Sequence, residues 1–215
     1  MSAQTGLRET RRRRTRRALL DAALSELAER SFGSLGLREV TRAAGVAPTA
    51  FYRHFGDMDE LGTALVEEAL DSLHGTVREI LDASGDAEQR GGAAVRLIAA
   101  LVRERPAHVR FLVRERHGGV AVVRDAIAAQ LDVFADETGA ALGSDPVSAG
   151  WQADDVTMLS RLLVDHMFMT ASAFLTASLR GEDWSAATGT ALAQLRLIHL
   201  GRVHWADGPA DGVTG

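Results

Sequence analysis

Four polar side chains are grouped around two phenylalanines that stand four residues apart. The phenylalanines are Phe51 and Phe55, and the polar residues are Thr49, Tyr52, Arg53 and His54. A guanidinium can bind the O6 and N7 edge of guanine with two hydrogen bonds. Hydroxyl, phenol and imidazole groups can hold phosphate oxygens. We therefore expect Arg53 to read a base and the other three residues to contact the nucleic-acid backbone.

These side chains need a short helix that projects from a core, and the neighbouring sequence predicts one. Leu37, Val40 and Ala44 recur at the spacing of one helical face. Gly45 follows where a helix end favours a left-handed residue, and Pro48 stands at a good first helical position. Phe51 and Phe55 would then anchor the second helix. The pattern is typical of a helix-turn-helix.

Helices are also predicted on both sides of this motif. Asp57 and Glu60 form an acidic capping box, which predicts a helix from there to about Asp82. The preceding helix would pack behind the motif through an apolar stripe, Leu20, Ala23, Leu24, Leu27 and Ala28. Ser31–Ser34 would end it.

An arginine run precedes the first helix, with six Arg in residues 11–17. Such a run can be a solvated tail. Placed before a helix-turn-helix, it can also follow a phosphate backbone or enter a minor groove. We expect residues 1–9 to be disordered and the run to act as a flexible arm. The remaining candidate DNA-binding residues are Arg13, Arg14, Arg16, Arg17 and Arg38.

Charge is divided unevenly along the 215 residues. Residues 1–60 hold 11 Arg against 8 acidic residues, whereas the rest holds 13 Arg against 21. A basic front on an acidic body favours nucleic-acid binding at one end. No cysteine is present, which excludes disulfides and thiolate sites. No apolar run approaches bilayer length, so we expect a cytoplasmic protein with no membrane partner.

The remaining chain is predicted to be helical, with helices at 94–104, 109–115, 120–141, 154–179 and 186–204. Gly91-Gly92 is expected in a loop. The last two helices are apolar on more than one side, so each needs cover from a partner chain, a ligand or a monomeric bundle. We favour a homodimer, which would also space two recognition helices about 34 Å apart on a palindromic site. Its expected interface residues are Leu163, Phe174, Leu192 and Leu195.

Catalytic signatures are absent from the sequence. There is no glycine-rich phosphate loop, no G-x-S-x-G and no H-E-x-x-H. The seven histidines are scattered, and Asp165-His166 can be either a core pair or a ligand contact. We therefore expect no catalytic residues, no metal and no enzyme.

The motif residues resemble the TetR family of bacterial transcriptional regulators. The family pattern appears here as Leu37-Arg38-Glu39-Val40, Ala43-Ala44-Gly45-Val46 and Phe51-Tyr52-Arg53-His54-Phe55. Gly36 and Ala47 stand where the family usually has Ser or Thr as N-caps, which weakens the local caps. The resemblance implies a dimeric repressor that binds a palindromic DNA operator.

A longer likeness reaches the body. The segment 105–116, RPAHVRFLVRER, and the motif closely resemble the FabR-type repressors of unsaturated fatty acid synthesis, a TetR subgroup that includes DesT. This implies control of lipid desaturation genes by long-chain acyl-CoA or acyl carrier protein thioesters. Arg110, Arg114, Arg116 and His117 would meet phosphates, or else form ion pairs with Glu104 and Glu115. The full set of candidate ligand-binding residues is Leu97, Leu101, Arg110, Phe111, Leu112, Arg114, Arg116, His117, Met158, Leu162, His166 and Phe168.

The sequence thus predicts an all-α protein of about nine helices in two domains. Residues 1–56 would form an arm and a three-helix DNA-binding domain, 57–205 a helical ligand-binding and dimerisation bundle, and 206–215 a disordered tail. The expected partners are operator DNA, a small hydrophobic effector and a second copy, with no bound cofactor. Two alternatives remain. One is a TetR-type sensor of another hydrophobic metabolite or drug that controls efflux or catabolic genes. The other is an acyl-binding or enzymatic bundle.

Overall fold

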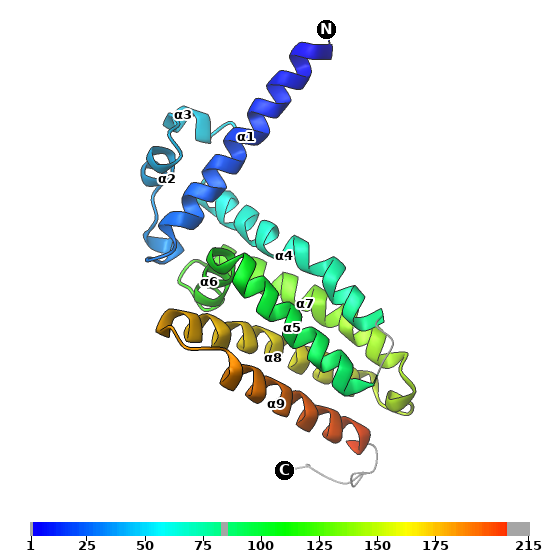
Figure 1. The fold of residues 1–215 in the computed structure, drawn as a ribbon. Coiled ribbons are helices and arrows are strands. Elements are labelled where there is room, and N and C mark those ends of the chain that lie inside the picture. Colours follow the sequence, from blue (N-terminus) through cyan, green and yellow to red (C-terminus); the bar gives the residue numbers. More distant parts are fainter. Residues whose placement is uncertain (1, 83–85, 206–215) are drawn as a thin grey trace. The chain divides into compact units, whose positions relative to one another are not determined.

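The computed structural model describes residues 2–82 and 86–205, with side chains for 8–71, 77 and 86–205. Within these residues every regular element is helical (Figure 1), which confirms the predicted all-α class. The predicted tail, 206–215, lies outside the described residues. The elements are α1 (Ser2–Glu26), η1 (Phe32–Ser34), α2 (Leu37–Ala43), α3 (Pro48–Phe51), α4 (Met58–Asp82), α5 (Ala87–Glu104), α6 (Pro106–Glu115), α7 (Ala121–Gly143), η2 (Pro146–Ser148), α8 (Ala153–Arg180) and α9 (Ser185–Val203).

The chain divides into two compact units. The first contains residues 1–72 and 105–130, and the second contains 73–104 and 131–215. The boundaries fall within α4 and α7 and between α5 and α6, so a segment far along the sequence completes the first unit. The predicted domain limits at 56/57 and 205/206 stay predictions.

The first unit has a core shared by six helices. Its buried apolar side chains come from α1, the helix-turn-helix, α4, α6 and the first half of α7, and include Leu20, Leu24, Val40, Phe51, Leu65, Phe111 and Ile127. The predicted α1 stripe is confirmed for Leu20, Ala23, Leu24 and Leu27, whereas Ala28 is only half-buried. One prediction here was wrong: residues 2–9, which were expected to be disordered, are helical, because α1 begins at Ser2.

The second unit packs α5, α8 and α9 against one another, and Figure 1 shows these helices side by side. The loop expected at Gly91-Gly92 is instead part of α5. A reciprocal cap begins the helix earlier than predicted, since Gln89 N–H donates to Asp86 Oδ1 at 2.8 Å and Asp86 N–H donates to Gln89 Oε1 at 3.2 Å. A Cβ on Gly91 would lie 3.3 Å from Leu195 Cδ1. Glycine therefore permits close approach of α9.

Helix α8 contains a long apolar stretch, of which about one third is buried. By length and composition alone, this helix is apolar enough to cross a bilayer, which is weak evidence for a membrane span. Core helices of water-soluble proteins pass the same test, so the finding marks apolar surface that needs cover.

Candidate nucleic-acid interface

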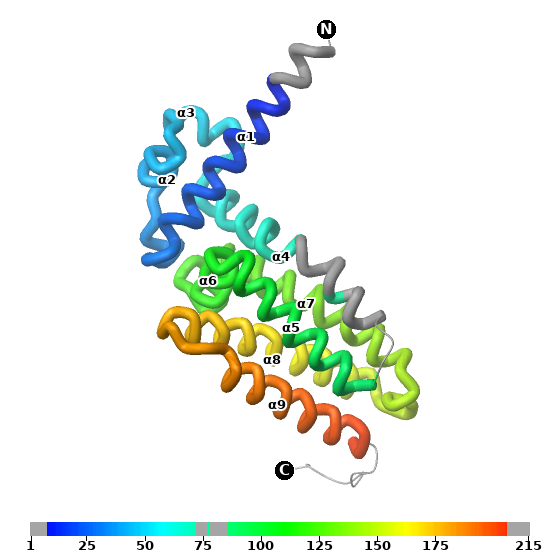
Figure 2. The backbone as a smooth tube through the Cα atoms, viewed as in Figure 1, coloured from blue at the N-terminus to red at the C-terminus, as the bar shows by residue number. Residues whose placement is uncertain are grey.

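The turn between α2 and α3 has the geometry that the sequence predicted. Gly45 has a φ of +66°, which is left-handed. Val46 N–H returns to the carbonyl of Thr41 at 3.0 Å and Gly45 N–H to that of Arg42 at 3.1 Å. These bonds satisfy carbonyls at the end of α2, so the turn is held by its own backbone. In Figure 2 the two short helices follow one another beside α1.

Helix α3 is anchored by the two phenylalanines, as predicted. Phe51 is 0% exposed and Phe55 is 2% exposed, and their ring centroids lie 5.5 Å apart. Pro48 occupies the first turn, and Ala47 caps the helix without a side-chain hydrogen bond. The helix is only four residues long, so the aromatic anchors hold its position.

The predicted DNA-binding residues of the motif lie on the opposite side. Tyr52 is 63% exposed, Thr49 and Arg53 are exposed, and His54 is half-buried. Arg38 is exposed on α2. The structure thus brings the four residues of the α3 segment to one projecting element, while their contacts with DNA stay predictions.

The arginine run forms part of α1, so it presents a fixed pattern of charge. Arg17 pairs with Glu68 at 2.9 Å and with Asp21 at 3.0 Å, and Arg13 pairs with Glu9 at 3.4 Å. The Arg16 guanidinium lies over the Phe55 ring, 5.2 Å from its centroid. Arg14 is exposed. Arg16 is therefore the arginine that the structure places directly against the motif.

His54 shows which charges converge beside α3. Burial lowers the pKa of His54 below its ordinary value of 6.5, and the positive charges of Arg12, Arg16 and Arg53 lower this pKa further. Arg12 was not among the predicted site residues. It stands four residues before Arg16, and this spacing would have identified it had the run been treated as helical. We call Arg12, Arg16, Arg53 and His54 the basic cluster.

The start of α4 is capped as predicted. Glu60 N–H donates to Asp57 Oδ1 at 2.8 Å, and the Glu60 carboxylate accepts from Gly56 N–H at 2.5 Å. The carboxylates also suit the positive end of the helix dipole. The cap therefore fixes where the chain leaves the motif.

The predicted ligand-binding residues are divided between the two units. Leu97, Leu101, Met158, Leu162, His166 and Phe168 lie on α5 and α8 of the second unit, where Met158 and Leu162 are exposed. Arg110, Phe111, Leu112, Arg114, Arg116 and His117 lie in or just after α6 of the first unit.

The α6 residues already have partners in the first unit. Phe111 is buried with its centroid 6.3 Å from that of Phe32. Arg114 donates to the carbonyls of Leu27 at 3.0 Å and Arg30 at 2.5 Å. Arg110 donates to the carbonyl of Ala28 at 3.4 Å. Backbone carbonyls therefore accept from both guanidinium groups, while Arg110 Nε is buried with no hydrogen-bond partner among the described residues. The contacts of these two residues with an effector stay predictions.

Among the predicted interface residues, Phe174 and Leu195 face inward. Phe174 is 0% exposed and stacks on Trp184 at 4.9 Å between centroids, and Leu195 lies against Gly91 of α5. Leu192 is exposed and Leu163 is half-buried. Besides Leu192, the exposed apolar surface of these helices is provided by Met158, Leu162, Met169 and Leu179 of α8 and by Leu197, Leu200 and Val203 of α9.

Comparisons with known proteins agree with this geometry. Residues 19–65 match the model described as bacterial regulatory proteins, tetR family. The chain is similar to a transcriptional regulator FadR from Bacillus subtilis in complex with stearoyl-CoA, with 16% identity, a TM-score of 0.66 and coverage of 83% of this chain and 96% of that one. Salmonella enterica GusR has 22% identity, a TM-score of 0.68 and coverage of 86% and 94%. Regulatory protein TetR from Rhodobacter sphaeroides has 20% identity, a TM-score of 0.61 and coverage of 83% and 95%.

Proposed function

We propose that this chain, which has the fold and the N-terminal domain of TetR-family transcriptional regulators, is a dimeric repressor whose operator affinity is set by a long-chain acyl thioester. The observation that carries the DNA-binding part is the two-sidedness of the α3 segment. Phe51 and Phe55 are buried in the core, while Tyr52 and Arg53 face solvent beside arginines of α1. A helix held in this way can enter a major groove.

The residues of the basic cluster and their neighbours are proposed to have different roles in DNA binding. Arg53 is the proposed base-reading residue, since a guanidinium can bind guanine bidentately. Thr49, Tyr52 and His54 bind phosphates, and Arg12 and Arg16 of α1 extend the same positive surface. Arg17 is proposed to have a smaller role because Glu68 and Asp21 neutralise it.

The proposed dimer forms through the apolar residues that α8 and α9 leave exposed. Met158, Leu162 and Met169 recur at spacings of four and seven, which places them on one face of α8. Leu192, Leu200 and Val203 follow a comparable stripe on α9. Exposed apolar patches of this kind mark association surfaces. Two copies would present two α3 segments to the half-sites of a palindrome.

The effector proposal draws on α8 and on one structural neighbour. His166 Nε2 is buried and has no hydrogen-bond partner among the described residues. Burial lowers the pKa of His166, although a hydrogen bond with the backbone of Ala191 opposes this change. A half-buried neutral imidazole among the apolar residues of α8 suits a largely apolar ligand with a few polar groups. The neighbouring FadR structure contains stearoyl-CoA, which favours an acyl thioester and control of fatty acid or desaturation genes here.

The test uses the intact protein. Duplexes are selected from a random library, and the enriched sequence is compared with the DNA upstream of the protein's own gene. A palindrome bound by a dimer is expected; no enrichment would contradict the DNA-binding proposal. Mass spectrometry of the purified protein then identifies co-bound acyl species, and titration with stearoyl-CoA should change operator affinity.

The alternative is a sensor of another hydrophobic metabolite or drug that controls efflux or catabolic genes. The likeness to GusR supports this alternative, because it shows that the fold is shared by regulators other than FadR. One fold can serve several functions. A selected operator whose affinity stearoyl-CoA does not change would support this alternative.

A further inference from the structure

The C-terminal end of α1 is capped by a side chain from α6. The last four carbonyls of a helix and those just after it lack partners within the helix. Arg114 donates from Nη1 to the carbonyls of Leu27 at 3.0 Å and Arg30 at 2.5 Å. A cation is also favoured at the negative end of the helix dipole. Arg114 therefore fixes the backbone where α1 ends.

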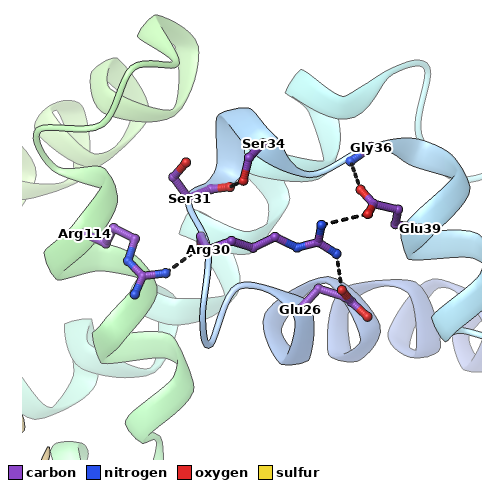
Figure 3. A network of polar contacts seen from close by, with 7 residues as sticks. All are labelled: Glu26, Arg30, Ser31, Ser34, Gly36, Glu39 and Arg114. Atoms are coloured by element: carbon purple, nitrogen blue, oxygen red, sulfur yellow. Dashed lines mark hydrogen bonds and ion pairs between the residues drawn. The ribbon is translucent and has the colours of Figure 1, made fainter.

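Arg30 is held at both ends. Its carbonyl accepts from Arg114, while its guanidinium donates to Glu26 of α1 and, at 2.7 Å, to Glu39 of α2. Figure 3 shows these contacts as a continuous chain from the α6 side chain to α2. Because one residue carries both sets of bonds, a displacement of the Arg30 backbone displaces the group that holds Glu39.

Glu39 in turn caps the helix on which it stands. Its Oε2 accepts from Gly36 N–H at 2.9 Å. Gly36 is the N-cap of α2 and has no side chain with which to cap the helix itself. The hydrogen bond from Arg30 lowers the pKa of Glu39, and the bond from Gly36 lowers it further. The start of α2 therefore depends on a carboxylate that Arg30 positions.

We propose that Arg114, Arg30 and Glu39 are positioning residues that form a relay through which α6 sets the placement of α2, and with it α3, on DNA. The inference rests on the proposed DNA-binding function. The tight turn after α2 carries the placement onward, because the bond from Val46 to Thr41 joins the turn to α2. A change in α6 would thus reach the recognition segment through hydrogen bonds within the first unit.

The experiment measures operator affinity and local amide exchange for full-length variants. Operator is the duplex selected by the wild-type protein. Arg114→Met, Arg30→Met and their double variant form a mutant cycle, and Arg96→Met of α5 is the matched control because Arg96 is exposed in the second unit. Glu39→Gln is the milder variant, since it retains an oxygen that can accept from Gly36 N–H. The unfolding midpoint of each variant is also measured, so that its operator affinity can be expressed per folded molecule.

The relay predicts that each single Met variant of the cycle weakens operator binding about tenfold, the ratio that corresponds to 1.4 kcal/mol. The double variant should bind the operator no more weakly than the weaker-binding single variant, because both substitutions interrupt the same chain of hydrogen bonds. Arg114→Met should also speed exchange at Gly36 N–H, and Arg114→Lys should restore part of the affinity. Arg96→Met should bind as wild type.

Two results of the affinity measurements would overturn the relay. One is additive losses in the double variant. The other is wild-type affinity per folded molecule for Arg114→Met despite a lower unfolding midpoint, since that would leave Arg114 with a purely stabilising role. If the wild-type protein selected no duplex, the DNA-binding proposal would fail. Exchange at Gly36 would then still decide whether α6 controls the start of α2: unchanged exchange in Arg114→Met would refute it.

Discussion

Glu115 accepts a hydrogen bond from the backbone N–H of Phe32 at 2.8 Å, although 83 residues separate the two along the chain. Glu115 is 1% exposed, and the Phe32 ring is 3% exposed against Phe111. A Cβ on Gly118 would overlap Glu115 Oε2, so glycine is needed beside the carboxylate. The end of α6 therefore contacts the chain after α1 at two points: Glu115 binds the start of η1, and Arg114 binds the carbonyls that precede it.

This bond predicts a difference between two substitutions of Glu115. Glu115→Ala leaves the buried Phe32 N–H without an acceptor and should lower the free energy of unfolding by about 1–3 kcal/mol. Glu115→Gln retains an oxygen at that position and should cost less. Urea unfolding of both variants, with the exposed Glu88→Ala as control, checks the difference. Equal losses for Ala and Gln would show that the acceptor has no special importance.

Gly62 predicts an effect of helix approach. A Cβ there would lie 2.6 Å from Val123 Cγ2 and 2.7 Å from Phe32 Cζ, so Gly62→Ala should overpack the first unit and cost about 1–3 kcal/mol. Gly189 is the matched case without crowding. It lies within α9, and a Cβ added there would have nothing within 4 Å. Gly189→Ala should therefore stabilise the protein by about 0.5–1 kcal/mol. Thermal unfolding of both variants measures the two signs, and a neutral Gly62→Ala would contradict the packing described here.

Base reading predicts a change of specificity. Arg53→Ala should weaken operator binding by about 1–3 kcal/mol and relax the preference at one base pair in each half-site. Repeating the duplex selection with this variant and with the control Arg96→Ala tests both effects. Uniform weakening on all sequences would instead assign Arg53 to the phosphates.

The helical arginine run predicts which charges matter for salt dependence. Arg16 lies against Phe55 beside the motif, and Arg16→Gln should reduce the slope of log affinity against log salt by about 1. Arg17→Gln should change it less, because Glu68 and Asp21 already hold that guanidinium. Binding isotherms at several salt concentrations give the slopes. Equal slopes for Arg16→Gln and the wild type would remove Arg16 from the interface.

His54 predicts a pH dependence of operator binding. Burial and then the charges of Arg12, Arg16 and Arg53 lower its pKa in the free protein. A bound phosphate favours the charged imidazole, so binding takes up a proton and affinity should rise as pH falls below about 6.5. His54→Gln should reduce this rise, as measured by binding isotherms between pH 5 and 8. A rise that His54→Gln retains in full would assign the linkage to another group.

The same shift has the opposite effect on folding. The folded-state pKa of His54 lies below that of the unfolded chain, so its contribution to stability is full above about pH 6.5 and is lost as pH falls. His108 and His166 have lowered pKa values for which burial is the first cause, and they act in the same direction. Because the folded fraction changes with pH, the operator affinities of His54→Gln and the wild type must be compared per folded molecule at each pH.

The sequence by itself determined the features that depend on neighbouring residues. The spacing of Phe51 and Phe55, the left-handed Gly45 and the cap at Asp57 and Glu60 were all predicted, because helical periodicity, glycine backbone freedom and capping act within a few residues. For the same reason the helical class and most helix positions could be predicted.

Tertiary structure decided what local patterns leave open. Gly91 lies against Leu195 of α9, Phe174 is buried against Trp184, and Arg114 binds carbonyls just after α1, more than 80 residues away. A periodic stripe shows that a face is apolar, and an arginine shows that a donor exists. Which group covers that face or accepts from that donor depends on how distant segments pack together, and spacing along the chain carries no information about it.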